Sequence, residues 1–243
     1  MANYNIGTLD PANAPYSVDN YNVFSADPTD IFKFQLNKIS DINIALDPIN
    51  GDADVGLYRD NGNGYWDSND VLIRLSNKSG TADDSLNLAD QATGTYFARV
   101  NYFSGNVVNY NLDVSTTSNY QASNLLPQEQ IVGQLGRYQD SITYTDSVGA
   151  SDTTDTYYFS VESSWRGTIT LSGLSNDADI RLISDANNNG IVDSGEVLRS
   201  STNGGTNSES LRIGYSTSTI LQVYQYSGNT NYTLTFDVEP YIT

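Results

Sequence analysis

The sequence predicts an all-β protein made of two tandem β-sandwich domains, each of a jelly-roll-like kind. Three observations lead to this fold class. Short runs of alternating apolar and polar residues are separated by turns rich in Asn, Asp, Gly and Ser. No stretch shows a convincing helical period of about 3.6 residues. The whole pattern also recurs after about 125 residues, which indicates two copies of one unit.

The strands are expected in the same order in both copies. In the first copy, Phe32, Phe34 and Leu36 alternate with more polar neighbours, so one strand face is apolar. Similar short patterns follow at 42–46, 55–57, 71–73, 86–88, 96–100 and 110–114. Their spacing near ten residues is typical of a sandwich rather than of alternating strands and helices.

The repeat also predicts the domain boundaries. The stretch DPTDIFKF at 27–34 recurs as DTTDTYYF at 152–159, and DADVGL at 52–57 recurs as DADIRL at 177–182. The polar, proline-containing stretch between the copies suits a linker. We therefore predict a first module at residues 1–118, a linker at 119–130 and a second module at 131–243.

Composition narrows the function. The chain carries 29 acidic and 11 basic residues, a formal charge of −18, so nucleic acid and anionic membrane surfaces are poor partners. It has neither cysteine nor histidine, which excludes disulfides and Ser-His-Asp or Cys-His catalysis. No apolar run approaches the roughly 20 residues of a membrane span. These features favour a protein that is not an enzyme and whose natural partners are cations.

Two acidic loops fit that expectation. Residues 185–196, DANNNGIVDSGE, have oxygen-bearing side chains at loop positions 1, 3, 5, 9 and 12 and glycine at position 6, the spacing of a calcium loop. The predicted Ca²⁺ ligands are Asp185, Asn187, Asn189, Asp193, Glu196 and the Ile191 carbonyl. In the shorter first loop they are Asp60, Asn63, Asp67, Asp70 and the Tyr65 carbonyl, whereas a one-residue deletion leaves ligation by Asn61 open. Neither loop is flanked by helical sequence, so these are expected between strands.

Other interpretations of the acidic residues remain open. Both loops can be hairpin turns closed by Asn and Asp side chains, without metal. One carboxylate of each upstream pair, Asp54 and Asp179, can complete a loop's ligand shell, or the pairs can be solvated strand-edge charges. Trp66, inside the first loop, is expected to be exposed and available for stacking.

The order of these motifs resembles the bacterial pre-peptidase C-terminal domain family. The resemblance rests on D-x-x-D-x-[FY]-x-F, DAD-[VI]-x-L, an Asp/Asn/Gly loop, G-T-Y-x-x-x-V and S-G-x-x-x-Y-x-L, in that order, and covers nearly the whole chain as two modules. Copy two departs from it at residues 218–220, where Ser-Thr-Ile replaces Gly-Thr-Tyr. The resemblance implies exported, non-catalytic β-sandwiches, often with bound calcium, that usually follow a secreted protease.

Two functions follow as hypotheses. The first is an extracellular or cell-surface structural protein whose calcium-stiffened modules associate with copies of themselves, in a matrix or in filaments. The second is a polysaccharide- or protein-binding accessory module of a secreted enzyme. The N-terminus lacks a readable secretory signal, so we expect non-classical or type I-like export, or a trimmed leader.

Overall fold

The computed structural model describes residues 1–241, and these divide into two compact units, residues 1–119 and residues 120–241. Across the described residues the regular structure is entirely β, which confirms the predicted fold class. No helix in this part of the chain is long and apolar enough to cross a bilayer. The predicted linker residues from 120 onward fall within the second unit.

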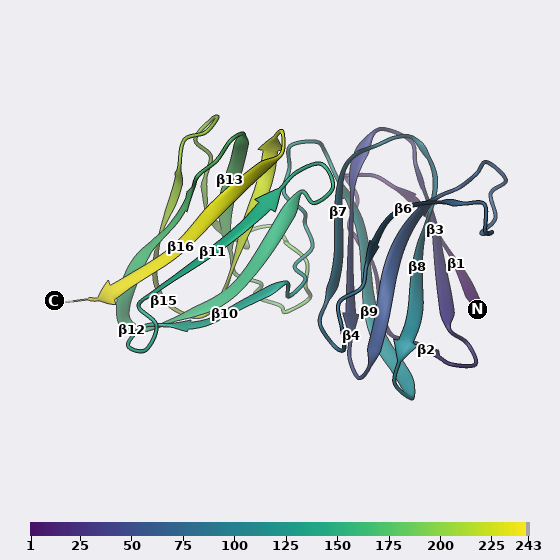
Figure 1. Cartoon of the computed structure of the whole chain (residues 1–243), viewed down its shortest axis with the longest axis horizontal. Helices are drawn as coiled ribbons and strands as arrows, with labels where there is room; N and C mark the ends of the chain where they lie inside the picture. Colours follow the sequence, from purple (N-terminus) through teal and green to yellow (C-terminus); the bar gives the residue numbers. More distant parts are fainter. Residues whose placement is uncertain (242–243) are drawn as a thin grey trace. The chain divides into compact units, whose positions relative to one another are not determined.

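The first unit is a sandwich of two sheets (Figure 1). One sheet has the order β1-β3-β8-β5-β6 and the other has the order β2-β9-β4-β7. The strands are β1 Ala2–Leu9, β2 Tyr16–Phe24, β3 Thr29–Leu36, β4 Ser40–Pro48, β5 Asp52–Arg59, β6 Val71–Ser76, β7 Asp84–Gln91, β8 Gly94–Ser104 and β9 Val107–Thr117. Phe32 and Phe34 of the first sheet and Ile44 and Leu112 of the second lie in one buried apolar cluster, so the core sits between the layers.

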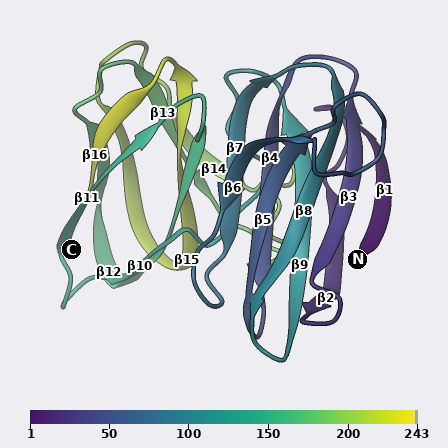
Figure 2. The same cartoon turned by 45° about the vertical axis from the view of Figure 1, so that its right-hand side comes forward.

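The second unit repeats this arrangement with longer strands (Figure 2). Its strands are β10 Gln130–Leu135, β11 Ser141–Val148, β12 Thr154–Ser172, β13 Asp177–Ile183, β14 Val197–Ser201, β15 Glu209–Ser227 and β16 Thr230–Pro240. The start of β12 pairs with β10 and with the end of β15, whereas its end pairs with β16 and with the start of β15. Thus β12 occupies the positions of both β3 and β4, and β15 those of both β7 and β8. The two strands pass from one layer to the other without a break.

The first strand of each unit is a parallel edge strand with a glycine irregularity. β1 pairs with β3 and β10 with β12, both in parallel, and each pairing slips by a residue at Gly7 or Gly133. The φ angles there are +83° and +89°, a left-handed conformation that glycine adopts without a steric penalty. The same bulge at the same place in both units supports the internal repeat.

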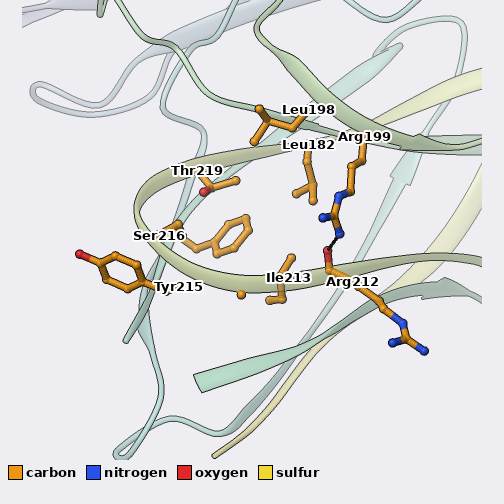
Figure 3. Close-up of a pocket in the computed structure, with 10 residues that line it drawn as sticks. Leu182, Leu198, Arg199, Arg212, Ile213, Tyr215, Ser216 and Thr219 are labelled. Carbon is orange, nitrogen blue, oxygen red and sulfur yellow. Dashed lines mark hydrogen bonds between the residues drawn. The ribbon is translucent and has the colours of Figure 1, made fainter. Parts of the chain in front are cut away.

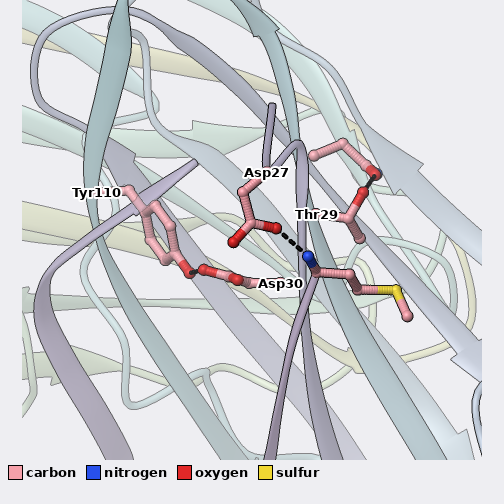
Figure 4. Close-up of polar contacts among 6 residues, drawn as sticks. Asp27, Thr29, Asp30 and Tyr110 are labelled. Atoms are coloured by element: carbon pink, nitrogen blue, oxygen red, sulfur yellow. Dashed lines mark hydrogen bonds and ion pairs between the residues drawn. The ribbon is translucent and has the colours of Figure 1, made fainter. Parts of the chain in front are cut away.

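In each unit a buried tyrosine hydroxyl donates to the second aspartate of the D-x-x-D motif. In the first unit, the Tyr110 hydroxyl donates to Asp30 Oδ2 over 2.6 Å (Figure 4). In the second unit, Tyr232 donates to Asp155 and also shares a hydrogen bond of 2.7 Å with the Tyr157 hydroxyl. Burial raises the pKa of both carboxyls. The second aspartate of the D-x-x-D motif therefore joins its strand, β3 or β12, to the strand of the tyrosine, β9 or β16.

We expect Tyr110→Phe to lower the free energy of unfolding of the first unit by about 1–3 kcal/mol, because Asp30 then lacks its buried donor. Urea unfolding measures the loss. Tyr138→Phe is the matched control, since the Tyr138 side chain is 91% exposed. Equal stability of the two variants would contradict the structural role of the Asp30–Tyr110 pair.

A pH dependence follows from Asp41 in β4, which is buried and accepts the Asp90 N–H over 2.9 Å. Burial raises its pKa to about 6. Between these two pKa values the folded state therefore keeps a proton on Asp41, whereas the unfolded chain, with an aspartate pKa near 3.9, has already lost it. The stability this proton contributes is full below about pH 4 and lost as pH rises through about 6.

In EDTA, the melting temperature of the first unit should therefore fall between pH 5 and pH 7.5. Asp41→Asn should reduce that slope, since this residue can no longer ionise, while Asp54 and Asp113, whose pKa values burial also raises to about 6, still contribute. Calorimetry at several pH values measures the slope. Asp19→Asn, an exposed change of equal charge, should alter it much less. A slope as steep in Asp41→Asn as in the wild type would assign the pH dependence to the other groups.

Candidate metal centres in the two acidic loops

Each predicted loop leaves the end of the strand that contains the DAD motif. Residues 60–70 connect β5 to β6, and residues 184–196 connect β13 to β14. Gly64, the fifth residue of the first loop, and Gly190, the sixth of the second, have φ angles of +77° and +73°. Both are left-handed conformations that glycine adopts without a steric penalty, which suits the turn at this place in each loop.

The second loop is closed by its own polar groups. Asp185 accepts the N–H groups of Asn189 and Gly190 at 3.2 and 3.0 Å. The side-chain amides of Asn187 and Asn189 both donate to Asp193 Oδ2, at 2.8 and 3.0 Å. The four predicted ligands therefore face one another across the loop.

Glu196, the last residue of this loop, is buried and holds its two ends together. Its Oε1 accepts the Ala186 N–H over 2.8 Å and its Oε2 accepts the Asp193 N–H over 2.9 Å. Both carboxylate oxygens thus point into the loop from its carboxyl end. A carboxylate at this position is the one that grips calcium with two oxygens in loops of this spacing.

The first loop has the same bonding frame despite the deletion. Gly64 donates to Asp60, and Asp70 accepts the N–H groups of Asn61 and Asp67 at 3.0 and 2.9 Å. The amides of Asn61 and Asn63 both donate to Asp67. Asn61 therefore stands where Asn187 stands in the second unit, and it joins Asn63 as a potential oxygen ligand.

Sequence reasoning left Asn61 open because the deletion was placed at that residue. The signal that identifies it is the pattern Asn-x-Asn-Gly, present at 61–64 and at 187–190. When the two loops are aligned on this pattern, the residue missing from the first loop corresponds to Ala186. The Ala186 side chain takes no part in the hydrogen bonds that close the second loop. The hydrogen bonds of the loop support that alignment.

The carboxylates of both loops are bridged by amides and backbone N–H groups rather than crowded together. These donors lower the pKa of Asp67, with the backbone N–H of Asn69 as the largest cause. Across residues 1–241, no three acidic side chains stand together as a ready-made metal site. The donor set nevertheless suits a hard cation, since every potential ligand is a carboxylate, amide or carbonyl oxygen.

Asp54 and Asp179 lie away from the loops. Asp54 is near the start of β5, whereas the loop follows its end, and six residues of strand span roughly 20 Å. Burial, followed by the charges of Asp84 and Asp52, raises the pKa of Asp54 to about 6. The structure therefore groups Asp54 with other acids and not with Asp60.

The aromatic residues of the first loop point in different directions. Tyr65 is 78% exposed, but Trp66 packs edge-on against Tyr58 and Phe97, with ring centroids 4.7 and 5.8 Å apart. The Arg99 guanidinium covers the same indole ring. The expectation of an exposed Trp66 is wrong, because the indole fills the space beneath the loop and fixes it to β5 and β8.

Part of the chain matches a known family. Residues 28–101, which run from the start of β3 into β8 and include the first loop, match the model of the Bacterial pre-peptidase C-terminal domain. No curated protein matches the chain.

Among solved structures, the pre-peptidase C-terminal domain of collagenase from Bacillus anthracis is similar at 16% identity and a TM-score of 0.36, covering 46% of this chain and 94% of that domain. PliG from Aeromonas hydrophila, a periplasmic inhibitor of g-type lysozyme, is similar at 18% identity and a TM-score of 0.33, covering 45% of this chain and 98% of that one.

A calcium titration followed by melting temperature tests the loops. Asp193→Ala should reduce the stabilisation that calcium gives to the second unit, because it removes the oxygen on which both amides converge. Asp146→Ala, an exposed residue of the same unit, is the matched control. An Asp193→Ala variant that responds to calcium like the control would show that Asp193 is not a ligand.

Proposed function

We propose that this chain, whose residues 28–101 carry a bacterial pre-peptidase C-terminal domain, is a non-catalytic accessory protein made of two calcium-binding modules. The observation that carries the proposal is the family match, since domains of this family are accessory modules of secreted proteases. The chain would act outside the cell, where calcium is abundant, and would hold a polysaccharide or protein for an exported enzyme.

Calcium would serve stability in this function rather than chemistry. In both loops two asparagine amides donate to one central carboxylate, Asp67 or Asp193, in frames that match despite different lengths. Extracellular modules of this ligand type bind calcium at roughly 10⁻⁴–10⁻³ M. A cation bound only by the folded state would stabilise each module by mass action.

A surface groove in the second unit supports the binding role (Figure 3). It has a volume of about 420 Å³ and lies beside β14 and the bend of β15. Leu198 and Tyr215, both exposed, line it, and Arg199 reaches across to donate to the Arg212 carbonyl oxygen over 2.9 Å. Tyr215 and Arg199 lie at separate places along the groove (Figure 3). They suit an extended sugar chain, because the ring can stack on a sugar face and the guanidinium can bind hydroxyl or carboxylate oxygens further along the chain.

Affinity electrophoresis through gels that contain acidic or neutral polysaccharides tests this role. We expect retardation of the full chain and its loss in a Tyr215→Ala, Arg199→Gln double variant. Tyr138→Ala with Arg137→Gln, which removes an exposed ring and a guanidinium outside the groove, is the matched control. Unchanged migration in every gel would leave a protein ligand as the accessory partner.

A second candidate function is self-association, which a specific observation favours. β6 and β14 are the outer strands of their sheets, and both present exposed aliphatic side chains. These are Val71, Leu72 and Leu75 in β6, and Val197 and Leu198 in β14. Each strand also has one exposed arginine, Arg74 or Arg199, of the kind that discourages pairing at an open edge. Their exposed aliphatic residues outnumber it, which favours strand addition between copies.

Light scattering with and without calcium separates the two candidates. If the chain assembles through these edges, larger particles should appear in calcium and should disappear in a Leu72→Lys, Leu198→Lys variant, because a lysine at an open edge opposes pairing. Ile39→Lys with Tyr138→Lys is the control, since both residues are more exposed than Leu72 and Leu198 and lie outside β6 and β14. A monomer under all conditions would leave the accessory binding role alone.

A further inference from the structure

Two tyrosine rings meet at the surface of the second unit, from places far apart in the sequence. Tyr120 is the first residue of this unit, and Tyr226 is the penultimate residue of β15. Their ring centroids lie 5.6 Å apart, a contact distance for aromatic rings, with 38° between the ring planes. Tyr120 is 57% exposed and Tyr226 is 47% exposed, so solvent and dissolved reagents reach both phenols of this surface pair.

The other tyrosine pairs in ring contact are shielded. Tyr4 and Tyr21, whose rings contact each other, are both half-buried. Tyr21 also contacts Tyr110, which is buried. Tyr144 contacts Tyr157, which is buried as well. Within the part of the chain that the structure describes, the surface pair is therefore the tyrosine contact in which both rings are exposed.

This exposure matters because the chain has no cysteine and so lacks the disulfides that commonly fasten domains outside the cell. It does have 18 tyrosines. Two phenols can form a covalent cross-link of their own when a one-electron oxidant acts on both. The surface pair can form that link within one molecule, since its two rings already touch.

We propose that Tyr120 and Tyr226 form an oxidative modification site, at which a haem peroxidase with hydrogen peroxide joins the two rings as dityrosine. Each phenol loses one electron and one proton, and the two phenoxyl radicals form a bond between ring carbons next to their oxygens. The hydrogens on those carbons then move to the oxygens, which restores both phenols. The peroxide takes up the two electrons and two protons and is reduced to two waters.

The new bond fastens the beginning of the second unit to the end of β15. It closes a loop of about 100 residues, and a cross-link over a loop of that length strongly restricts the unfolded chain. The carbon–carbon bond is also not cleaved by thiols, unlike a disulfide. The site goes beyond the proposed function, because it depends neither on the acidic loops nor on the groove beside β14.

Oxidation of the full chain in dilute solution, by a haem peroxidase with hydrogen peroxide, tests the site. We expect dityrosine fluorescence in the monomer fraction, and a linked peptide containing Tyr120 and Tyr226 whose mass is lower by two hydrogen atoms. The melting temperature of the second unit should rise in the oxidised monomer. Tyr120→Phe and Tyr226→Phe should each remove the fluorescence of the monomer and the linked peptide. Tyr138→Phe, which changes a 91% exposed ring outside the pair, should remove neither.

Each of these substitutions removes one hydroxyl from an exposed ring, so the variants should fold, and circular dichroism verifies this. Dityrosine that is absent from the monomer overturns the site, whether larger species contain it or not, because the paired rings then do not couple within one molecule. A cross-link of the monomer that survives in both Tyr120→Phe and Tyr226→Phe overturns it as well, since the bond then joins other tyrosines.

Discussion

Burial of carboxylates without a positive partner is the constraint on which this structure depends. The chain has 29 acidic residues against 11 basic ones, and the sandwich places several acids where water does not reach. Each of these requires a hydrogen-bond donor, a proton or a cation. Tyr110 and Tyr232 supply the donor for Asp30 and Asp155. In the loops, asparagine amides and backbone N–H groups supply it, and Glu196 is satisfied in this way even though it is buried.

The same constraint explains why the polar residues at matching places in the two units are mostly of two types, asparagine and serine. Asparagine is frequent in the loops because its amide both donates to a carboxylate and accepts a backbone N–H, as Asn187 does. Serine is placed beside Asp84 and Glu209 for its donor hydroxyl. Core positions are matched as well, since Phe34 corresponds to Phe159 and Leu57 to Leu182, whereas Lys33, which is outside the core, corresponds to Tyr158. The polar donors and the core residues therefore identify the repeat together.

Much of the fold could be predicted from the sequence because alternation and repetition are local signals. Phe32 and Phe34 lie in the core as their spacing indicates. The continuity of β12 could not be predicted, since residues 162–165 have the polar composition of a turn yet remain in the strand. The loop spacing identified Asp185 to Glu196, whereas the distance of Asp54 from the first loop depends on which end of β5 it occupies.

The stretch predicted as a linker shows how composition can mislead. Its proline and polar residues suit a flexible connection, but Leu125 and Leu126 are buried within the second unit. Leu126 N–H donates to the Gly190 carbonyl, and Val192 N–H donates to the Asn124 carbonyl, both over 2.8 Å. This segment therefore runs beside the second acidic loop, joined to it by an isolated antiparallel bridge between Leu125 and Ile191. Whatever closes that loop also fixes the segment beside it, because the two share backbone hydrogen bonds. The two adjacent leucines within a polar stretch indicate that this segment packs against a core, because a solvated linker is poor in large apolar residues.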